Sequence, residues 1–119
     1  MTILDNALAH FDRNRSKLLS IDVPEWGAEG VPAKVYFYAV PTIEEKAAVR
    51  RELLIDDVRG TLKLLCLRAL DASGQPIFAV ADFDRWMVAL DPDVAARVAS
   101  QIEVESKKYR TEAEEQLRD

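Results

Sequence analysis

The sequence predicts an α+β fold in which a small antiparallel β-hairpin packs against four or five α-helices. Two short segments in the first third of the chain are rich in β-branched and aromatic residues, and glycines and a proline separate them. Apolar residues at helical spacing precede and follow these segments. The chain has 119 residues, of which 49% are hydrophobic. This suffices for one core but not for two, so residues 1–102 are expected to form a single domain.

An amphipathic helix is predicted at the start of the chain, over residues 2–15. Its apolar side chains share one stripe, formed by Ile3, Leu4, Ala7, Leu8 and Phe11. An apolar stripe of this kind is normally buried against another part of the protein or against a partner.

The predicted hairpin consists of two short strands. The first, Ser20–Gly27, alternates apolar and polar residues before Pro24, and the second, Lys34–Val40, is dense in β-branched and aromatic residues. The glycines and the proline of Gly27–Pro32 suit a turn or a loose loop, so an antiparallel connection is expected.

Helical structure is predicted after the hairpin. Thr42 can accept a hydrogen bond from the amide of Glu45 while the Glu45 side chain reaches back to Thr42, which is a capping box. Downstream, apolar residues step by three or four over residues 54–69, but Asp56 and Gly60 interrupt them. The pattern is compatible with a break near Asp56 or with one long helix.

Turn-forming residues at Asp71–Pro76 end this helical region, and Ile77–Val80 is predicted to be a very short extended segment. Asp82 and Asp91 are the predicted N-caps of two further helices. Pro92 suits the first position of the second helix, where its missing N–H costs nothing.

The last helix is expected to bury Val94, Val98 and Ile102. Beyond Ile102 the apolar spacing fades and charged residues dominate. Residues 103–119 are therefore predicted to be a polar helix extension or a disordered tail.

The composition argues against several classes of partner and location. The formal net charge of -5 repels phosphate backbones and anionic lipids, so neither nucleic acid nor a membrane is expected to bind. The single cysteine, Cys66, lies in an apolar run and is expected to be a buried thiol, which fits a reducing compartment. Residues 1–17 lack the pattern of a secretory signal, and no apolar run approaches the roughly 20 residues that span a bilayer. A cytoplasmic location is therefore expected.

No combination of residues predicts catalysis. His10 is the only histidine, and nucleophilic catalysis normally needs a base beside the nucleophile and a third group to orient the base. One histidine and one cysteine far apart in the sequence do not supply a four-ligand zinc site. Residues 71–82 begin like a calcium loop, but Pro76 stands where that loop needs glycine and Asp82 where it needs glutamate. We predict a non-enzymatic protein without a metal or cofactor.

Aromatic residues of the hairpin are the predicted binding groups. Trp26 lies on the first strand, and Tyr36, Phe37 and Tyr38 lie on the second. Because side chains alternate along a strand, the last three cannot share one face. The hairpin is therefore either covered on both sides or presents aromatic surface, and aromatic residues are enriched at protein interfaces. We predict Trp26, Tyr36 and Tyr38 to be protein-binding residues.

Several short motifs follow one another in order between about residue 20 and residue 102. They are Val23-Pro24-Glu25-Trp26-Gly27, an aromatic strand, the Thr42–Glu45 helix start, Leu70-Asp71 with Gly74 and Phe78, and a closing helix to Ile102. In this order the chain resembles the tail assembly chaperones of long-tailed, siphophage-type phages.

The resemblance implies a non-structural protein that binds the tape measure protein, keeps it soluble and helps tail tube subunits polymerise around it in the host-cell cytoplasm. It also implies self-association into a homo-oligomer and a longer second product made by ribosomal frameshifting. Two other interpretations stay open. One is a small structural or tail completion component of a phage-like particle, and the other is a generic protein-binding or ligand-binding domain.

Overall fold

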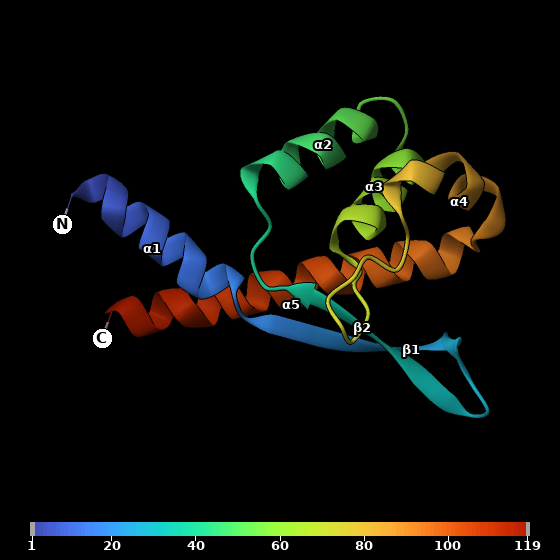
Figure 1. The fold of residues 1–119 in the computed structure, drawn as a ribbon, viewed down its shortest axis with the longest axis horizontal. Coiled ribbons are helices and arrows are strands. Elements are labelled where there is room, and N and C mark those ends of the chain that lie inside the picture. Colours follow the sequence, from blue (N-terminus) through green and yellow to red (C-terminus); the bar gives the residue numbers. More distant parts are fainter. Residues whose placement is uncertain (1, 119) are drawn as a thin grey trace.

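The computed structural model describes residues 2–118 and confirms the α+β class, with a two-stranded hairpin and five α-helices. In chain order the elements are α1 (Ile3–Arg15), β1 (Leu18–Ala28), β2 (Val31–Tyr38), α2 (Ile43–Leu53), α3 (Asp57–Arg68), the 3-10 turn η1 (Val80–Asp82), α4 (Phe83–Ala89) and α5 (Pro92–Arg118). In the view of Figure 1 the long helix α5 crosses the molecule, with the hairpin below it and α2, α3 and α4 above it.

The hairpin is longer than the sequence predicts, and its turn is tighter. Ala28 pairs with Val31, so only Glu29 and Gly30 lie in the turn. Their φ angles are 53° and 79°, as a two-residue type I′ turn requires. The loose loop considered for Gly27–Pro32 is not formed, because the strands extend into it from both sides. The second strand also ends two positions earlier than expected, at Tyr38.

A large bulge interrupts the pairing in β1. The regular register ends at Val23, which leaves residues 24–27 opposite Pro32 alone. Neither proline of this region can donate to the ladder, and prolines in strands are typical of such irregular positions. Trp26 lies within the bulge, so the alternation of faces along a regular strand does not determine where its ring points.

The predicted capping box at the start of α2 is present. The amide of Glu45 donates to Oγ1 of Thr42 over 2.9 Å, and the amide of Thr42 donates to Oε1 of Glu45 over 2.8 Å. The chain then breaks at Asp56, whose side chain caps α3 by accepting two backbone N–H groups. Of the two alternatives for this region, the break is correct. Gly60 lies inside α3, where an added Cβ would come within 2.2 Å of Leu53 on α2, so its small size allows the two helices to approach.

The segment before α4 differs from its prediction. Ile77–Val80 does not form an extended strand, because the chain bends there to bury Phe78 and enters the 3-10 turn. Asp82 precedes α4 as predicted, but its side chain accepts no capping hydrogen bond. Asp91 caps α5 by accepting two backbone amides, and the helix continues without interruption to Arg118.

The core lies between the hairpin, α3 and the first half of α5. Its buried side chains are Val23, Val35 and Phe37 of the hairpin, Leu62, Leu64, Leu65, Cys66 and Ala69 of the α3 region, Phe78, and Ala95, Val98, Ala99 and Ile102 of α5. The predicted burial of Val98, Ile102 and Cys66 is confirmed, whereas Val94 is only partly buried. Burial raises the pKa of the Cys66 thiol, which therefore stays protonated at neutral pH.

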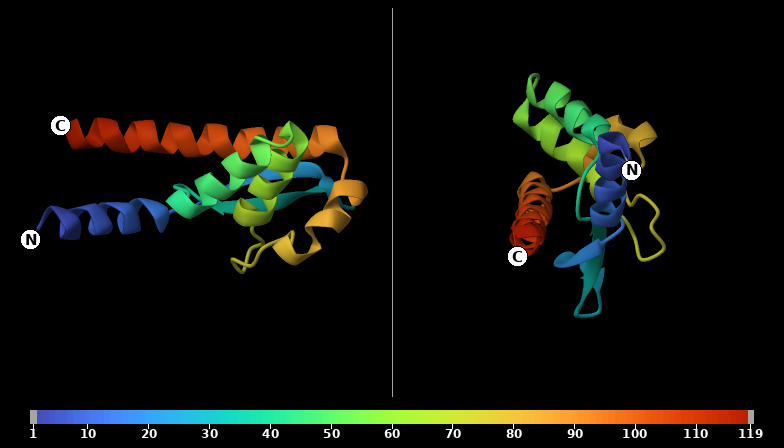
Figure 2. Two further views of the ribbon diagram at one scale, coloured as in Figure 1. Left: turned by 90° about the horizontal axis from the view of Figure 1, so that it is seen from above. Right: turned by 90° about the vertical axis from the view of Figure 1, so that its left-hand side faces the viewer.

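Helix α1 stands away from this core. It extends from the body in the same direction as the C-terminal half of α5 (Figure 2), and none of its residues is buried. The apolar stripe that includes Leu4 and Leu8 is therefore uncovered within the single chain.

Candidate protein-binding surfaces

The side chain of Trp26 is packed against other aromatic residues. Its ring packs edge-on against Phe78, with the ring centroids 5.3 Å apart, and Phe78 packs in the same way against Trp86 at 5.6 Å. The indole N–H of Trp86 donates to the carbonyl oxygen of Ala79 over 3.0 Å. This aromatic trio, Trp26, Phe78 and Trp86, joins the bulge of β1 to α4.

Tyr36 and Tyr38 lie on the face of β2 opposite to its buried core residues, and both are half-buried. The guanidinium of Arg15, at the end of α1, lies over the ring of Tyr38 at 4.9 Å from its centroid. The hairpin thus brings Tyr36 and Tyr38 together on one face and places Trp26 against the core.

The bulge is also tied to α5 by an ion pair. Nη1 of Arg97 donates to Oε2 of Glu25 over 2.6 Å, and Nη2 of Arg97 donates to Oε1 of the same carboxylate. These hydrogen bonds lower the pKa of the Glu25 carboxyl and raise that of the Arg97 guanidinium. Both side chains are well exposed, so the pair orients the bulge more than it stabilises the fold.

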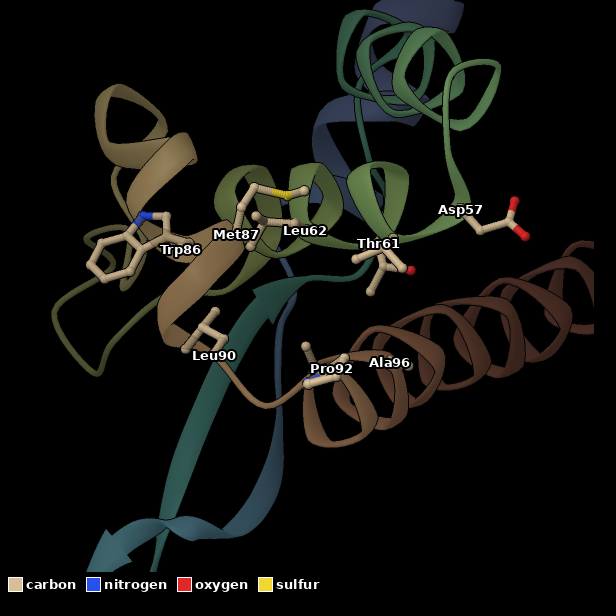
Figure 3. Close-up of a pocket in the computed structure, with 10 residues that line it drawn as sticks. Asp57, Thr61, Leu62, Trp86, Met87, Leu90, Pro92 and Ala96 are labelled. Carbon is tan, nitrogen blue, oxygen red and sulfur yellow. The ribbon is translucent and has the colours of Figure 1, made fainter.

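An apolar groove lies between α3, α4 and the start of α5 (Figure 3) and has a volume of about 240 Å³. Met87 of α4 lies beside Leu62 of α3, and Leu90 and Pro92 border the other side. Val58 and Met87 remain 52% and 37% exposed. We call this hollow the α3/α4 groove.

The apolar surface continues over the connection between α2 and α3. Leu54 and Ile55 are exposed there, and they are followed by Val58, which lines the α3/α4 groove. Contiguous exposed apolar patches mark sites of protein interaction. This surface was not predicted from the amino-acid sequence, because the same apolar residues are typical of a helix that is buried along one face.

The arrangement of these elements matches a solved structure, that of the tail assembly chaperone of bacteriophage HK97. The TM-score is 0.58, and the match covers 82% of this chain and 91% of that chain at 22% sequence identity. This chain has the fold of a phage tail assembly chaperone. The resemblance inferred from the sequence is thereby confirmed at the level of the fold. No family model and no curated protein matches the sequence.

Within this tail assembly chaperone fold, α1 and the end of α5 carry a second apolar surface. Phe11 of α1 and Leu117 of α5 border a hollow between the two helices, and Val40 lies in its lining. Leu4 and Leu8 continue the apolar stripe of α1 outward from this hollow.

The groups that could serve metal binding or catalysis are not brought together. Over residues 2–118, no three side chains of His, Cys, Asp or Glu converge as metal ligands would. His10 is exposed on α1, where its Nε2 is 3.1 Å from the side-chain amide of Asn14, whereas Cys66 lies in the core. None of the helices in this range is long and apolar enough to cross a membrane.

Proposed function

We propose that this protein is a phage tail assembly chaperone that binds the tape measure and tail tube proteins in the host-cell cytoplasm and is absent from the finished particle. The observation that carries the proposal is the match of its fold to the HK97 tail assembly chaperone. The exposed apolar grooves provide binding surface for clients. The net charge of -5 keeps the protein soluble while it carries that surface.

The α3/α4 groove suits an amphipathic helix as its occupant. Helices bind to other proteins by laying an apolar face into a groove of this kind. Met87 at its wall has a flexible thioether side chain, which adapts to different apolar partners. A long helical tape measure protein offers many such faces.

Introducing carboxylates into the α3/α4 groove is expected to abolish client binding. We expect Val58→Asp combined with Met87→Asp to lower the amount of co-purified tape measure protein at least tenfold, because an unpaired carboxylate would be buried at the interface. The measurement is the ratio of client to chaperone after affinity purification. Val88→Asp is the matched control, since Val88 lies beside Met87 on α4 but is 88% exposed and does not line the groove. Equal recovery by the double variant and the control would contradict a role for the groove.

We also propose Trp26, Tyr36 and Tyr38 as client-binding residues. Tyr36→Ser and Tyr38→Ser are each expected to lower client recovery by roughly fivefold, which is typical of an aromatic residue at an interface. Trp26→Ala is expected to lower both recovery and the free energy of unfolding, because its ring packs on Phe78. Thermal unfolding and client recovery are measured on the same preparations. Unchanged recovery would remove the residue concerned from the binding surface.

Self-association belongs to the same proposal. We propose that the apolar stripe of α1 is covered by another copy of the chain in a homo-oligomer, since no residue of α1 is buried in the single chain. Leu4→Glu combined with Leu8→Glu would then shift the protein toward the monomer in light scattering.

The direct test is co-expression with the tape measure and tail tube proteins encoded near this chain, followed by pull-down and sizing. Recovery of a client that is insoluble alone supports the chaperone. A monodisperse protein beside aggregated clients contradicts it and favours a generic binding domain. Mass spectrometry of finished particles distinguishes the structural alternative, because a tail completion component would be present there and a chaperone absent.

A further inference from the structure

Arg68, in the last turn of α3, is a cation that is buried in the protein. The residue is only 7% exposed. Its Nη2 donates to the carbonyl oxygen of Tyr38 over 2.6 Å and to Oγ of Ser106 over 2.9 Å. In the described range no carboxylate lies within salt-bridge distance of Arg68. Burial of a charge costs free energy unless an opposite charge and hydrogen bonds compensate it.

The guanidinium of Arg68 has N–H groups that the two hydrogen bonds to Tyr38 and Ser106 do not use. A guanidinium carries five N–H donors, and the two hydrogen bonds above use only those of Nη2. Among residues 2–118, no buried side-chain nitrogen or oxygen is left both inaccessible and without a partner. The Nε and Nη1 atoms of Arg68 therefore reach accessible space.

Arg68 also lines a groove between α2, α3 and α5, with a volume of about 300 Å³. Val49 and Leu53 of α2 and Leu64 of α3 supply aliphatic walls. Two exposed cations of α2, Lys46 and Arg50, line the same groove. We call it the α2/α5 groove.

The two acids that line this groove do not neutralise it. Glu45 already has partners outside the groove, because its Oε1 accepts hydrogen bonds from Arg15 over 3.0 Å and from the amide of Thr42. Glu103 is the other acid, and the lining also contains three cations, Lys46, Arg50 and Arg68. Burial lowers the pKa of the Arg68 guanidinium, and Glu45 and Glu103 act in the opposite direction. An acidic protein thus holds a local excess of positive charge beside an apolar wall.

We propose that the α2/α5 groove binds a carboxylate of a partner protein, an aspartate or glutamate carried on the apolar side of an amphipathic helix. Nε and Nη1 of Arg68 lie on different edges of the guanidinium, so the carboxylate accepts a single charge-assisted hydrogen bond from one of them, which is stronger than a hydrogen bond between neutral groups. Lys46 and Arg50 attract the acid, and Val49 and Leu53 cover the neighbouring aliphatic residues of the helix. The identity of the partner as the tape measure protein rests on the proposed function, whereas the chemistry of the groove does not.

The groove is tested first with a small probe, isocaproate, which combines a carboxylate with a branched aliphatic chain. It is titrated into the full chain while the methyl resonances of Val49, Leu53 and Leu64 are followed by NMR. We expect saturable shifts in the millimolar range for isocaproate and none for its uncharged analogue, isocaproamide. Equal shifts with both compounds, or no shift at all, would overturn the proposal.

The matched variants keep Arg68 and change only exposed side chains of α2. Lys46→Glu combined with Arg50→Glu is expected to weaken isocaproate binding at least fivefold. Arg51→Glu is the control, because Arg51 is the next residue of α2 but lines a different hollow, with Thr42 and Lys63. Equal weakening by the control and the double variant would mean that net charge alone acts, and this would also overturn the site.

Pull-down of the co-expressed tape measure protein then identifies the source of the carboxylate. A fivefold loss of recovery in the double variant, with none in Arg51→Glu, supports the tape measure protein. Recovery that is equal in all three proteins overturns this source, and a change in oligomer size in the double variant replaces it with a second copy of the chain. A wild-type protein that binds isocaproate but recovers no tape measure protein contradicts the proposed function and leaves the carboxylate site standing.

Discussion

Replacing Phe78 by alanine is expected to lower the free energy of unfolding by about 3–5 kcal/mol, the range for truncating a buried phenylalanine. Phe78 is 6% exposed and contacts both Trp26 and Trp86 edge-on. Removing its ring therefore leaves a cavity and ends two aromatic contacts at once. Because domains of this size are stable by only about 5–15 kcal/mol, the loss is a large part of the total.

Urea unfolding followed by far-UV circular dichroism measures this loss. The chain has two tryptophans, and both contact Phe78, so their fluorescence reports directly on the cavity. We expect emission of the folded variant at longer wavelength, because water reaches the two indoles. Phe11→Ala is the control, since Phe11 lies on α1 outside the core, and it should cost less than about 1 kcal/mol. A similarly small cost for Phe78→Ala would show that the trio does not hold the hairpin to α4.

Gly27→Ala is expected to be the most disruptive single-methyl change in the hairpin, at about 3 kcal/mol. A Cβ at Gly27 would lie 1.9 Å from the carbonyl oxygen of Val31 and 2.8 Å from Cα of Pro32. Both atoms belong to the backbone of β2, so rotation of a side chain cannot relieve the clash. The bulge would have to move away from β2 and take Trp26 with it.

Gly30→Ala separates this clash from the general cost of replacing a hairpin glycine. Gly30 has a φ of 79°, but nothing lies within 4 Å of the added Cβ. Its cost should be only the conformational one, about 1 kcal/mol. The free energies of unfolding of the two variants are compared by thermal unfolding. Equal losses would mean that the bulge moves to accommodate the added methyl group of Gly27→Ala. If the bulge positions Trp26 for a client, Gly27→Ala should also lower client recovery more than Gly30→Ala.

The two proposed client sites differ in the chemistry that they accept. The α3/α4 groove is lined largely by apolar side chains such as Met87 and Leu90, which select for hydrophobic surface alone. The α2/α5 groove adds the guanidinium of Arg68 and therefore selects for an acid within such surface. Both lie between α3 and helices that pack against it.

Features that depend on residues a few positions apart could be predicted from the sequence alone. It predicted the bounds of α1 from the spacing of its apolar residues, the start of α2 from the Thr42 capping box, and the start of α5 from Asp91 and Pro92. It also indicated the hairpin and the fold resemblance to tail assembly chaperones. Capping and periodicity are local interactions, so their outcome is present in short stretches of sequence.

Features that join distant parts of the chain depend on tertiary packing, and the sequence did not predict them. The bulge of β1 places Trp26 against Phe78. Met87 of α4 lines a groove that forms where α4 packs beside α3. Arg68 shows the reason most directly, because its two hydrogen-bond partners are 30 and 38 positions away in sequence. No pattern within a helix indicates which distant carbonyl oxygen or hydroxyl will meet a buried arginine. The grooves exist because helices separated in sequence pack side by side without filling the space between them.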